Sequence, residues 1–194
     1  MTVKSSGSLA FSEIQTEFTG SNPISLSEYY AGGSYVTAGT TGINGAIPSS
    51  GAISVSKFYG TQKTLAILAL TAGSYAYDFV GDPYNQYQYT AVGYAIGLSI
   101  GTCSPGTIQG QTIYELYQIN DIIDLQDKFK FTFGGGPYSQ SYFTTIQIYV
   151  GASLIKTYNS SEATLNVYGN SWTWDIAYGS GPFTSGDSYT VIIK

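Results

Sequence analysis

The chain has 194 residues and a formal net charge of −5, and only 10% of its residues are charged, well below the roughly 25% of an average soluble domain. It contains no histidine, and all seven of its cationic side chains are lysines. The commonest general base, the commonest transition-metal ligand and the usual bidentate clamp for phosphate are therefore missing. The acidic balance argues against a nucleic-acid partner, and no apolar run reaches the ~18 residues of a membrane span. We therefore expect that the protein is not an enzyme, binds no cofactor and does not span a membrane.

Three short segments near the N-terminus repeat one pattern. They are residues 9–14 (LAFSEI), 24–30 (ISLSEYY) and 53–59 (ISVSKFY). Each places an apolar residue, a serine, a charged residue and a bulky apolar or aromatic residue in the same order, which predicts a short helix beginning at a serine N-cap. In the first segment Gln15 follows Ser12 by three residues, as in a capping box. Turn residues dominate the links, so we interpret residues 1–62 as an extended docking arm.

Large apolar and aromatic side chains of this arm are candidate assembly contacts. A Gly/Ser-rich segment of this length is too small to bury all of them by itself. We therefore expect them to insert into grooves on neighbouring copies or on another protein. The candidates are Ile14, Phe18, Leu26, Tyr29, Tyr30, Val55, Phe58 and Tyr59.

Residues 63–194 carry the pattern of an all-β domain. Short runs of β-branched and aromatic residues alternate with turn signals. In residues 129–133 (FKFTF) the aromatic side chains share one face, and in residues 146–150 (IQIYV) the aliphatic ones do. The spacing favours an antiparallel two-sheet β-sandwich over a parallel α/β fold. The predicted strands are 64–72, 89–97, 112–117, 128–133, 144–150, 153–158, 163–168, 172–177 and 189–193.

A tyrosine-rich segment lies at the start of this domain. Residues 75–94 combine several tyrosines with asparagine, glutamine and aspartate. Tyrosine with amide side chains is the composition of adaptable recognition loops, and it also suits a wet interface between subunits. We therefore predict a recognition or subunit-contact surface that includes Tyr77, Tyr84, Tyr87 and Tyr89.

Several side chains invite a chemical interpretation that must be weighed against a structural one. Asp121, Asp124 and Asp127 form an acidic cluster that either binds calcium or lies in a solvated turn, and their spacing is not that of a calcium loop. A carboxylate pair such as Asp78 and Asp82 for glycoside hydrolysis is the weaker alternative.

The remaining candidates are aromatic or contain sulfur. Trp172 and Trp174 share a strand face and either fill the sandwich core or form a platform for a sugar ring, with the core favoured. The single cysteine, Cys103, cannot form an intrachain disulfide or a cysteine zinc site. We expect it to be a small buried apolar group, or else to pair between subunits.

Stretches in both halves of the chain resemble known sequences. Residues 11–15 (FSEIQ), 20–30 (GSNPISLSEYY) and 45–51 (GAIPSSG), leading to 58–60 (FYG), are similar to a module that recurs at the N-termini of tailed-bacteriophage virion proteins. One departure is Thr37, where that module would have a proline. Residues 143–146 (FTTI), 171–174 (SWTW) and 188–192 (SYTVI) are similar to a β-rich domain of phage tail and fibre-like proteins.

The resemblance implies a structural role in a virion and no catalytic residues. The N-terminal part would mount the protein, and the β domain would project or pack against neighbours. A tail-associated fibre, baseplate or collar protein is the first expectation. A head decoration protein that stabilises the capsid and a host-glycan-binding adhesin are the alternatives. We expect partners among other virion proteins, a homo-oligomer such as a trimer because virion sites are symmetric, and location in the virion after assembly in the host cytoplasm.

Overall fold

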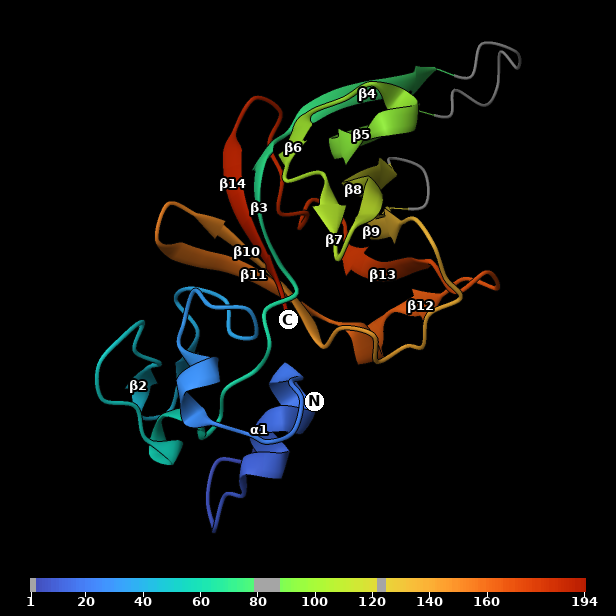
Figure 1. The fold of residues 1–194 in the computed structure, drawn as a ribbon. Helices are drawn as coiled ribbons and strands as arrows, with labels where there is room; N and C mark the ends of the chain where they lie inside the picture. Colours follow the sequence, from blue (N-terminus) through green and yellow to red (C-terminus); the bar gives the residue numbers. More distant parts are fainter. Residues whose placement is uncertain (1–2, 79–87, 122–124) are drawn as a thin grey trace. The chain divides into compact units, whose positions relative to one another are not determined.

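The computed structural model describes residues 3–78, 88–121 and 125–194 (Figure 1). The chain divides into two compact units. The first runs to Thr64 and also takes in Lys194, and the second comprises Leu65–Ile193. The sequence placed the division two residues earlier, after residue 62. The expectation of a mainly β protein with antiparallel sheets is confirmed.

The first unit contains one α-helix, two short 3-10 helices and a small hairpin. The helix α1 spans Phe11–Phe18, and the 3-10 helices η1 and η2 span Leu26–Tyr29 and Val55–Phe58. The strands β1 (Thr41–Gly42) and β2 (Gly45–Ala46) pair antiparallel. Each of the three repeated segments therefore forms a helical turn, as their shared pattern predicts.

The position of the helix caps differs from the prediction. The N-cap of α1 is Ala10, so Ser12 lies inside the helix and does not cap it. Glu13 supplies only the reciprocal bond of a capping box, because its Oε2 accepts the backbone N–H of Ala10 at 2.8 Å. That hydrogen bond, with the Lys4 ammonium at 2.8 Å, holds the pKa of Glu13 below its usual value. In η1 the cap is Ser25, whose Oγ accepts the N–H of Ser27 at 3.3 Å.

The second unit is built from strands β3 to β14. Their bounds are β3 (Ala66–Thr71), β4 (Gly73–Asp78), β5 (Gln88–Ala95), β6 (Thr102–Ser104), β7 (Thr107–Ile108), β8 (Gln111–Asp121), β9 (Gln126–Phe133), β10 (Thr145–Val150), β11 (Ser153–Asn159), β12 (Thr164–Leu165), β13 (Ser171–Ala177) and β14 (Ser188–Ile193). Two 3-10 helices, η3 (Ile96–Leu98) and η4 (Ser160–Glu162), lie between strands. Every predicted strand overlaps one of these, and β4, β6 and β7 are additional strands that the prediction did not include.

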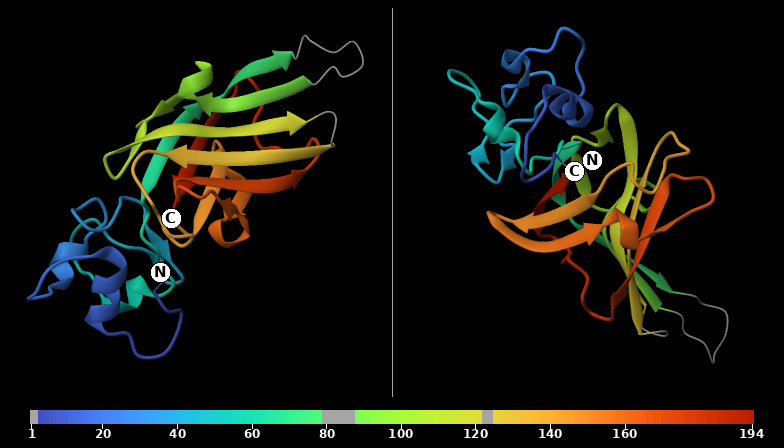
Figure 2. Two further views of the ribbon diagram at one scale, coloured as in Figure 1. Left: turned by 90° about the vertical axis from the view of Figure 1, so that its right-hand side faces the viewer. Right: turned by 90° about the horizontal axis from the view of Figure 1, so that it is seen from below.

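The strands form two antiparallel sheets. The five-stranded sheet has the order β11-β10-β14-β3-β6, and the seven-stranded sheet has the order β12-β13-β9-β8-β5-β4, with β7 paired to β8. Figure 2 shows the strands of the larger sheet lying side by side. Their inward faces share one core, as in a sandwich. Along β9 the side chains of Phe129, Phe131 and Phe133 are fully buried, which confirms the predicted alternation.

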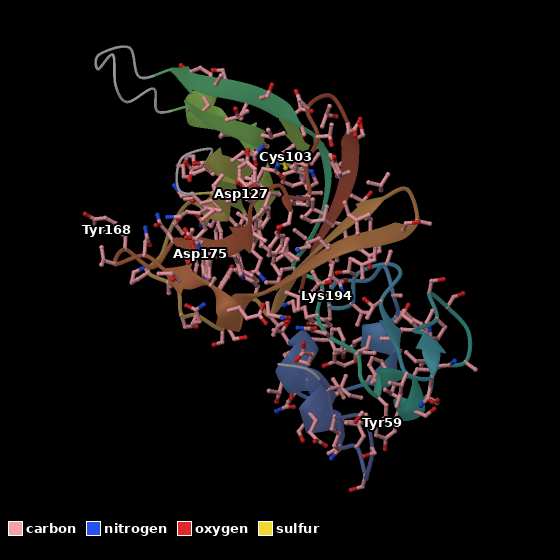
Figure 3. All side chains as sticks on the ribbon, turned by 180° about the vertical axis from the view of Figure 1, so that it is seen from behind. Tyr59, Cys103, Asp127, Tyr168, Asp175 and Lys194 are labelled. Carbon is pink, nitrogen blue, oxygen red and sulfur yellow. The ribbon has the colours of Figure 1, made fainter. Side chains whose placement is uncertain are left out.

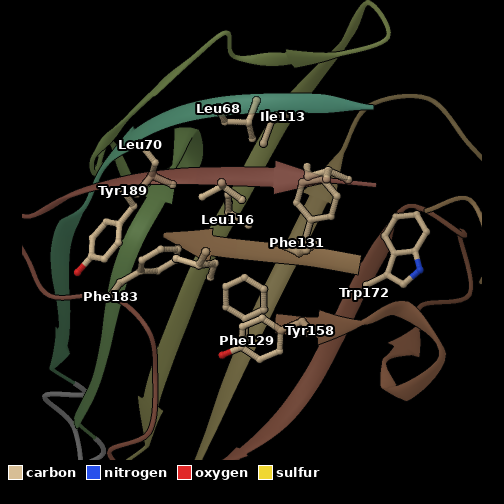
Figure 4. Packing of buried hydrophobic residues seen from close by; sticks show 14 of the residues in the cluster. Leu68, Leu70, Ile113, Leu116, Phe129, Phe131, Tyr158, Trp172, Phe183 and Tyr189 are labelled. Carbon is tan, nitrogen blue, oxygen red and sulfur yellow. The ribbon is translucent and has the colours of Figure 1, made fainter. Parts of the chain in front are cut away.

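Aromatic side chains dominate this core (Figure 4). Phe129 stacks on Tyr158 with ring centroids 4.0 Å apart, and Phe133 stacks on Trp172 at 5.4 Å. Burial also raises the pKa of the Tyr158 phenol above its ordinary value. Aromatic pairs of this kind contribute about 0.5–1.5 kcal/mol each beyond the area that they bury. The larger sheet and the smaller one are thus joined by ring contacts contributed from both.

The chain passes from one sheet to the other between β3 and β4, with only Ala72 between them. Three glycines meet at this crossing. A Cβ atom on Gly73 would lie 2.4 Å from the backbone nitrogen of Gly101, and one on Gly101 would lie 2.2 Å from the carbonyl oxygen of Gly93. Gly93 and Gly101 also have positive φ values of 142° and 65°. The crossing therefore requires residues without side chains.

Candidate interaction surfaces

The eight predicted contact residues of the first unit fall into two groups. Ile14, Phe18, Tyr29 and Phe58 are at most 1% exposed, and they belong to a hydrophobic core of the first unit itself. Phe58 makes edge-on ring contacts with Phe18 and Tyr29, each at a centroid distance of 6.1 Å. The expectations that this segment is extended and that it cannot bury these side chains without a partner are wrong.

The repeated pattern explains how so short a segment makes a core. Ile14, Tyr29 and Phe58 occupy the same position in the three repeats, the fourth residue of each helical turn. Leu9, Ile24 and Ile53 precede the three caps and pack against the same core. A residue before the cap and the fourth residue of the turn form a hydrophobic staple. Three such staples therefore converge on one interior, which the links complete with Val36 and Ile47.

The second group remains partly exposed. Leu26, Tyr30, Val55 and Tyr59 are half-buried. The Tyr30 hydroxyl donates to the carbonyl oxygen of Gly51, and the Tyr59 hydroxyl donates to that of Gly7. These two side chains hold turns of the first unit in place. Among residues 3–64, the large apolar side chains that stay exposed are Phe11, at 40%, and Ile43, at 62%. Neither was among the contact residues predicted from the sequence.

The tyrosine-rich candidate surface is only partly described. Tyr84 and Tyr87 lie outside the described residues. Tyr77 on β4 and Tyr89 on β5 are register partners, so the backbone places them opposite each other on neighbouring strands. The strand β4 is the last strand of that sheet. The backbone thus brings these two predicted residues together at a sheet edge.

The acidic candidates do not form a described site. Asp124 and Asp82 lie outside the described residues, and Asp121 is the last residue of β8. Asp127 is fully buried, and its Oδ2 accepts the backbone N–H of Gly179 at 2.8 Å. The expectation that Asp127 lies in a solvated turn is wrong, because it occupies the inward-facing register of β9. Among residues 3–78, 88–121 and 125–194, no group of three potential metal-ligating side chains is found.

The two tryptophans and the cysteine have structural environments. Trp172 and Trp174 are at most 3% exposed and lie in the aromatic core, which confirms the core interpretation over the sugar platform. The Trp174 Nε1 donates to the carbonyl oxygen of Asn159 at 2.7 Å. Cys103 is half-buried, and this burial raises the pKa of its thiol to about 11. At neutral pH the thiol is protonated, and a protonated thiol is a poor nucleophile.

A surface that the sequence analysis missed lies where three turns of the second unit meet. The turn between β7 and β8 contributes Gln109, and the start of β8 contributes Gln111 and Tyr114. The segment after β9 contributes Tyr138 and Tyr142, and the turn before β13 contributes Asn170. We refer to these six residues as the Tyr-Gln surface. Tyr114 is 46% exposed, Gln109 and Gln111 are exposed, and the others are half-buried.

Hydrogen bonds join the three turns to one another. The Tyr142 hydroxyl donates to the Gln109 Oε1 at 2.9 Å. The Gly134 N–H donates to the carbonyl oxygen of Thr112 at 2.7 Å, and the Tyr138 N–H donates to that of Gly169 at 2.7 Å. The three turns are therefore held in one arrangement. Tyr168, which is 76% exposed, projects from the tip of the same turn as Asn170 (Figure 3).

The five-stranded sheet has apolar side chains on its outer face. Ile67 of β3 is the register partner of Ile192 of β14, and Ile67 is 42% exposed. At the other end of the sheet, Leu154 and Ile155 of the edge strand β11 are 49% and 44% exposed. Exposed apolar side chains on an edge strand are unusual in a protein that works alone, because such edges pair with other chains.

Comparisons with protein-family models, with curated proteins and with solved structures find no match for this chain. Within the described part of the chain, no helix is long and apolar enough to cross a membrane.

Proposed function

We propose that the chain is a structural component of a bacteriophage particle, associated with the tail as part of a fibre, baseplate or collar. The observation that carries this proposal is the resemblance of residues 8–60 to the N-terminal module of tailed-phage virion proteins. The low charge and the apolar outer face of the five-stranded sheet support it, because subunits of permanent assemblies bury much of their surface against neighbours. The alternative of a head decoration protein shares all of these features.

The first unit is the mounting unit in this proposal. Because Ile14, Phe18, Tyr29 and Phe58 fill its own core, they are not the docking contacts. The contacts are the apolar side chains that the unit leaves exposed, Phe11 and Ile43. They present apolar surface on a preformed module, so docking requires no ordering of a flexible arm and its entropic cost is smaller than that of folding on binding.

Incorporation into particles tests the mounting role. Phage carrying the gene without residues 1–64 should yield particles that lack the β unit. The double variant Phe11→Ser with Ile43→Ser should lower incorporation at least tenfold while the chain stays folded. The control is Leu125→Ser, which removes an apolar side chain of the second unit with nearly the same exposure, 63% against 62% for Ile43. Normal incorporation of the double variant would contradict the proposed contacts. Normal incorporation of the chain that lacks residues 1–64 would contradict the mounting role.

A further inference from the structure

The Tyr-Gln surface is built from three segments without charged residues. No Asp, Glu, Lys or Arg occurs between Asp82 and Glu115, between Lys130 and Lys156, or between Glu162 and Asp175. The fold brings one turn from each of these segments together. The surface is therefore electrically neutral although it is polar, and it offers no charged partner to a phosphate, a carboxylate or a cation.

The side chains of this surface pair aromatic rings with amides. Tyr138 and Tyr142 lie with ring centroids 4.3 Å apart, and Tyr138 also packs on the buried Phe133 at 4.7 Å. The rings are thus supported from below by the core. The amides of Gln109, in the β7–β8 turn, and Gln111, at the start of β8, flank them, and each carries two N–H donors and a carbonyl acceptor.

Glycines keep the surface open beside these rings. A Cβ atom on Gly135 would lie 2.5 Å from the Tyr138 hydroxyl oxygen and 3.1 Å from the Gln111 Oε1. A Cβ atom on Gly134 would lie 3.4 Å from the Tyr114 ring. The rings and amides therefore lie against bare backbone, and Tyr138 donates its hydroxyl proton to the Gly134 carbonyl at 2.8 Å. Because the surface is already ordered, a ligand would lose little affinity to rearrangement.

We propose that the Tyr-Gln surface binds a neutral oligosaccharide. Sugar rings present apolar C–H faces that stack on aromatic rings, and hydroxyl groups that exchange hydrogen bonds with amides and phenols. The absence of charge selects a neutral sugar over a sialylated or phosphorylated one. Tyrosine also anchors protein interfaces, but this surface lacks the tryptophan and arginine that share that role, and Tyr138 and Tyr142 are half-buried, so a protein partner fits less well. The inference does not depend on the proposed function, because it concerns the purified chain alone.

Binding of the full-length chain to a glycan array that carries neutral and acidic oligosaccharides tests this proposal. We expect one or more neutral structures to bind, and their sialylated counterparts to bind at least tenfold more weakly. Titration calorimetry with the best neutral hit should give at least a tenfold loss of affinity for Tyr114→Ala and for Gln111→Ala. The matched control is Tyr178→Ala, which removes an equally exposed tyrosine, at 50%, outside the surface.

The folded state of each variant is checked by the near-ultraviolet circular dichroism of the buried tryptophans, since Trp172 lies 6.3 Å from Tyr138 between ring centroids. Three results would overturn the proposal: no neutral glycan is bound by the folded chain, only charged glycans are bound, or binding survives both surface substitutions. Failure of this test leaves the particle proposal intact, because that proposal is measured by incorporation.

Discussion

Close contacts between glycine backbones fix the crossing from β3 to β4. Gly101 combines a φ of 65° with atoms at 2.2 Å and 2.7 Å from the place where a Cβ would stand, the carbonyl oxygens of Gly93 and Thr71. Backbone oxygens cannot move aside as the tip of a flexible side chain can. The two sheets can therefore come together at this crossing only if the residue is glycine.

We expect Gly101→Ala to lower the free energy of unfolding of the second unit by about 2–5 kcal/mol, from the left-handed backbone conformation and the overlap together. Urea denaturation followed by tryptophan fluorescence measures this loss. The control is Gly151→Ala, where φ is 56° but no atom lies within 4 Å of the Cβ position, so only about 1 kcal/mol should be lost. Equal losses for the two variants would show that the close approach at Gly101 carries no cost.

Buried polar side chains hold the turn between β13 and β14. The Gln118 Oε1 accepts the N–H of Phe183 at 2.7 Å, and Asp127 accepts that of Gly179. The burial of Asp127 was predictable from the alternation along β9. Asp127 lies two residues before Phe129 and four before Phe131, so its side chain faces the same side of the strand. The sequence could not show which backbone groups it meets, since Gly179 is far along the chain and is brought near by folding.

At the scale of elements, the three repeats of the first unit were predictable and their caps were not. The repeated spacing predicts three helical turns, and the structure has them. The cap is shifted because each segment offers two candidate cap residues two positions apart, and in the first segment the earlier candidate is Ala10, whose side chain has no hydrogen-bond acceptor.

The strand predicted at residues 163–168 is longer than the observed one. The chain turns there because the Asn166 Oδ1 accepts the N–H of Asn170 at 3.1 Å, which ends β12 at Leu165.

The cap position can be tested by supplying the missing side chain. Ala10→Ser should stabilise the first unit by about 0.5–1 kcal/mol, because Ala10 already has the extended backbone of a cap, with φ −89° and ψ 152°. The companion Ser25→Ala should destabilise it by a similar amount, since Ser25 caps η1. Thermal unfolding followed by far-ultraviolet circular dichroism reports both changes. If Ser12→Ala proved more harmful than Ser25→Ala, the cap assignment would be wrong.

At the scale of the whole molecule, the first unit has a core of its own that its sequence does not predict. Its large apolar residues exceed what a segment of this length is expected to bury, because burial by a small domain is limited. The three staples nevertheless bury these side chains together with Val36 and Ile47, which lie in the links between the helical turns. Sequence patterns show which residues share a face of one element. They do not show that turn-rich links between elements will fold around a common interior.

The division into two units predicts two separable unfolding transitions. Phe58→Ala should lower the stability of the first unit by about 3–5 kcal/mol, because Phe58 is fully buried in its core. Both tryptophans, Trp172 and Trp174, lie in the second unit, so tryptophan emission follows that unit alone. We expect the far-ultraviolet signal to gain an earlier transition while the tryptophan transition keeps its midpoint. An equal shift of both signals would show that the units unfold as one.

The copy number of the chain in purified particles tests the central claim most directly. Quantitative mass spectrometry, calibrated against the major capsid protein, should find the chain at a constant ratio that survives further purification. A few copies to a few dozen would agree with a fibre, baseplate or collar protein, and several hundred would instead indicate head decoration or the repeating part of the tail. Complete absence of the chain from infectious particles would contradict the structural role in the virion.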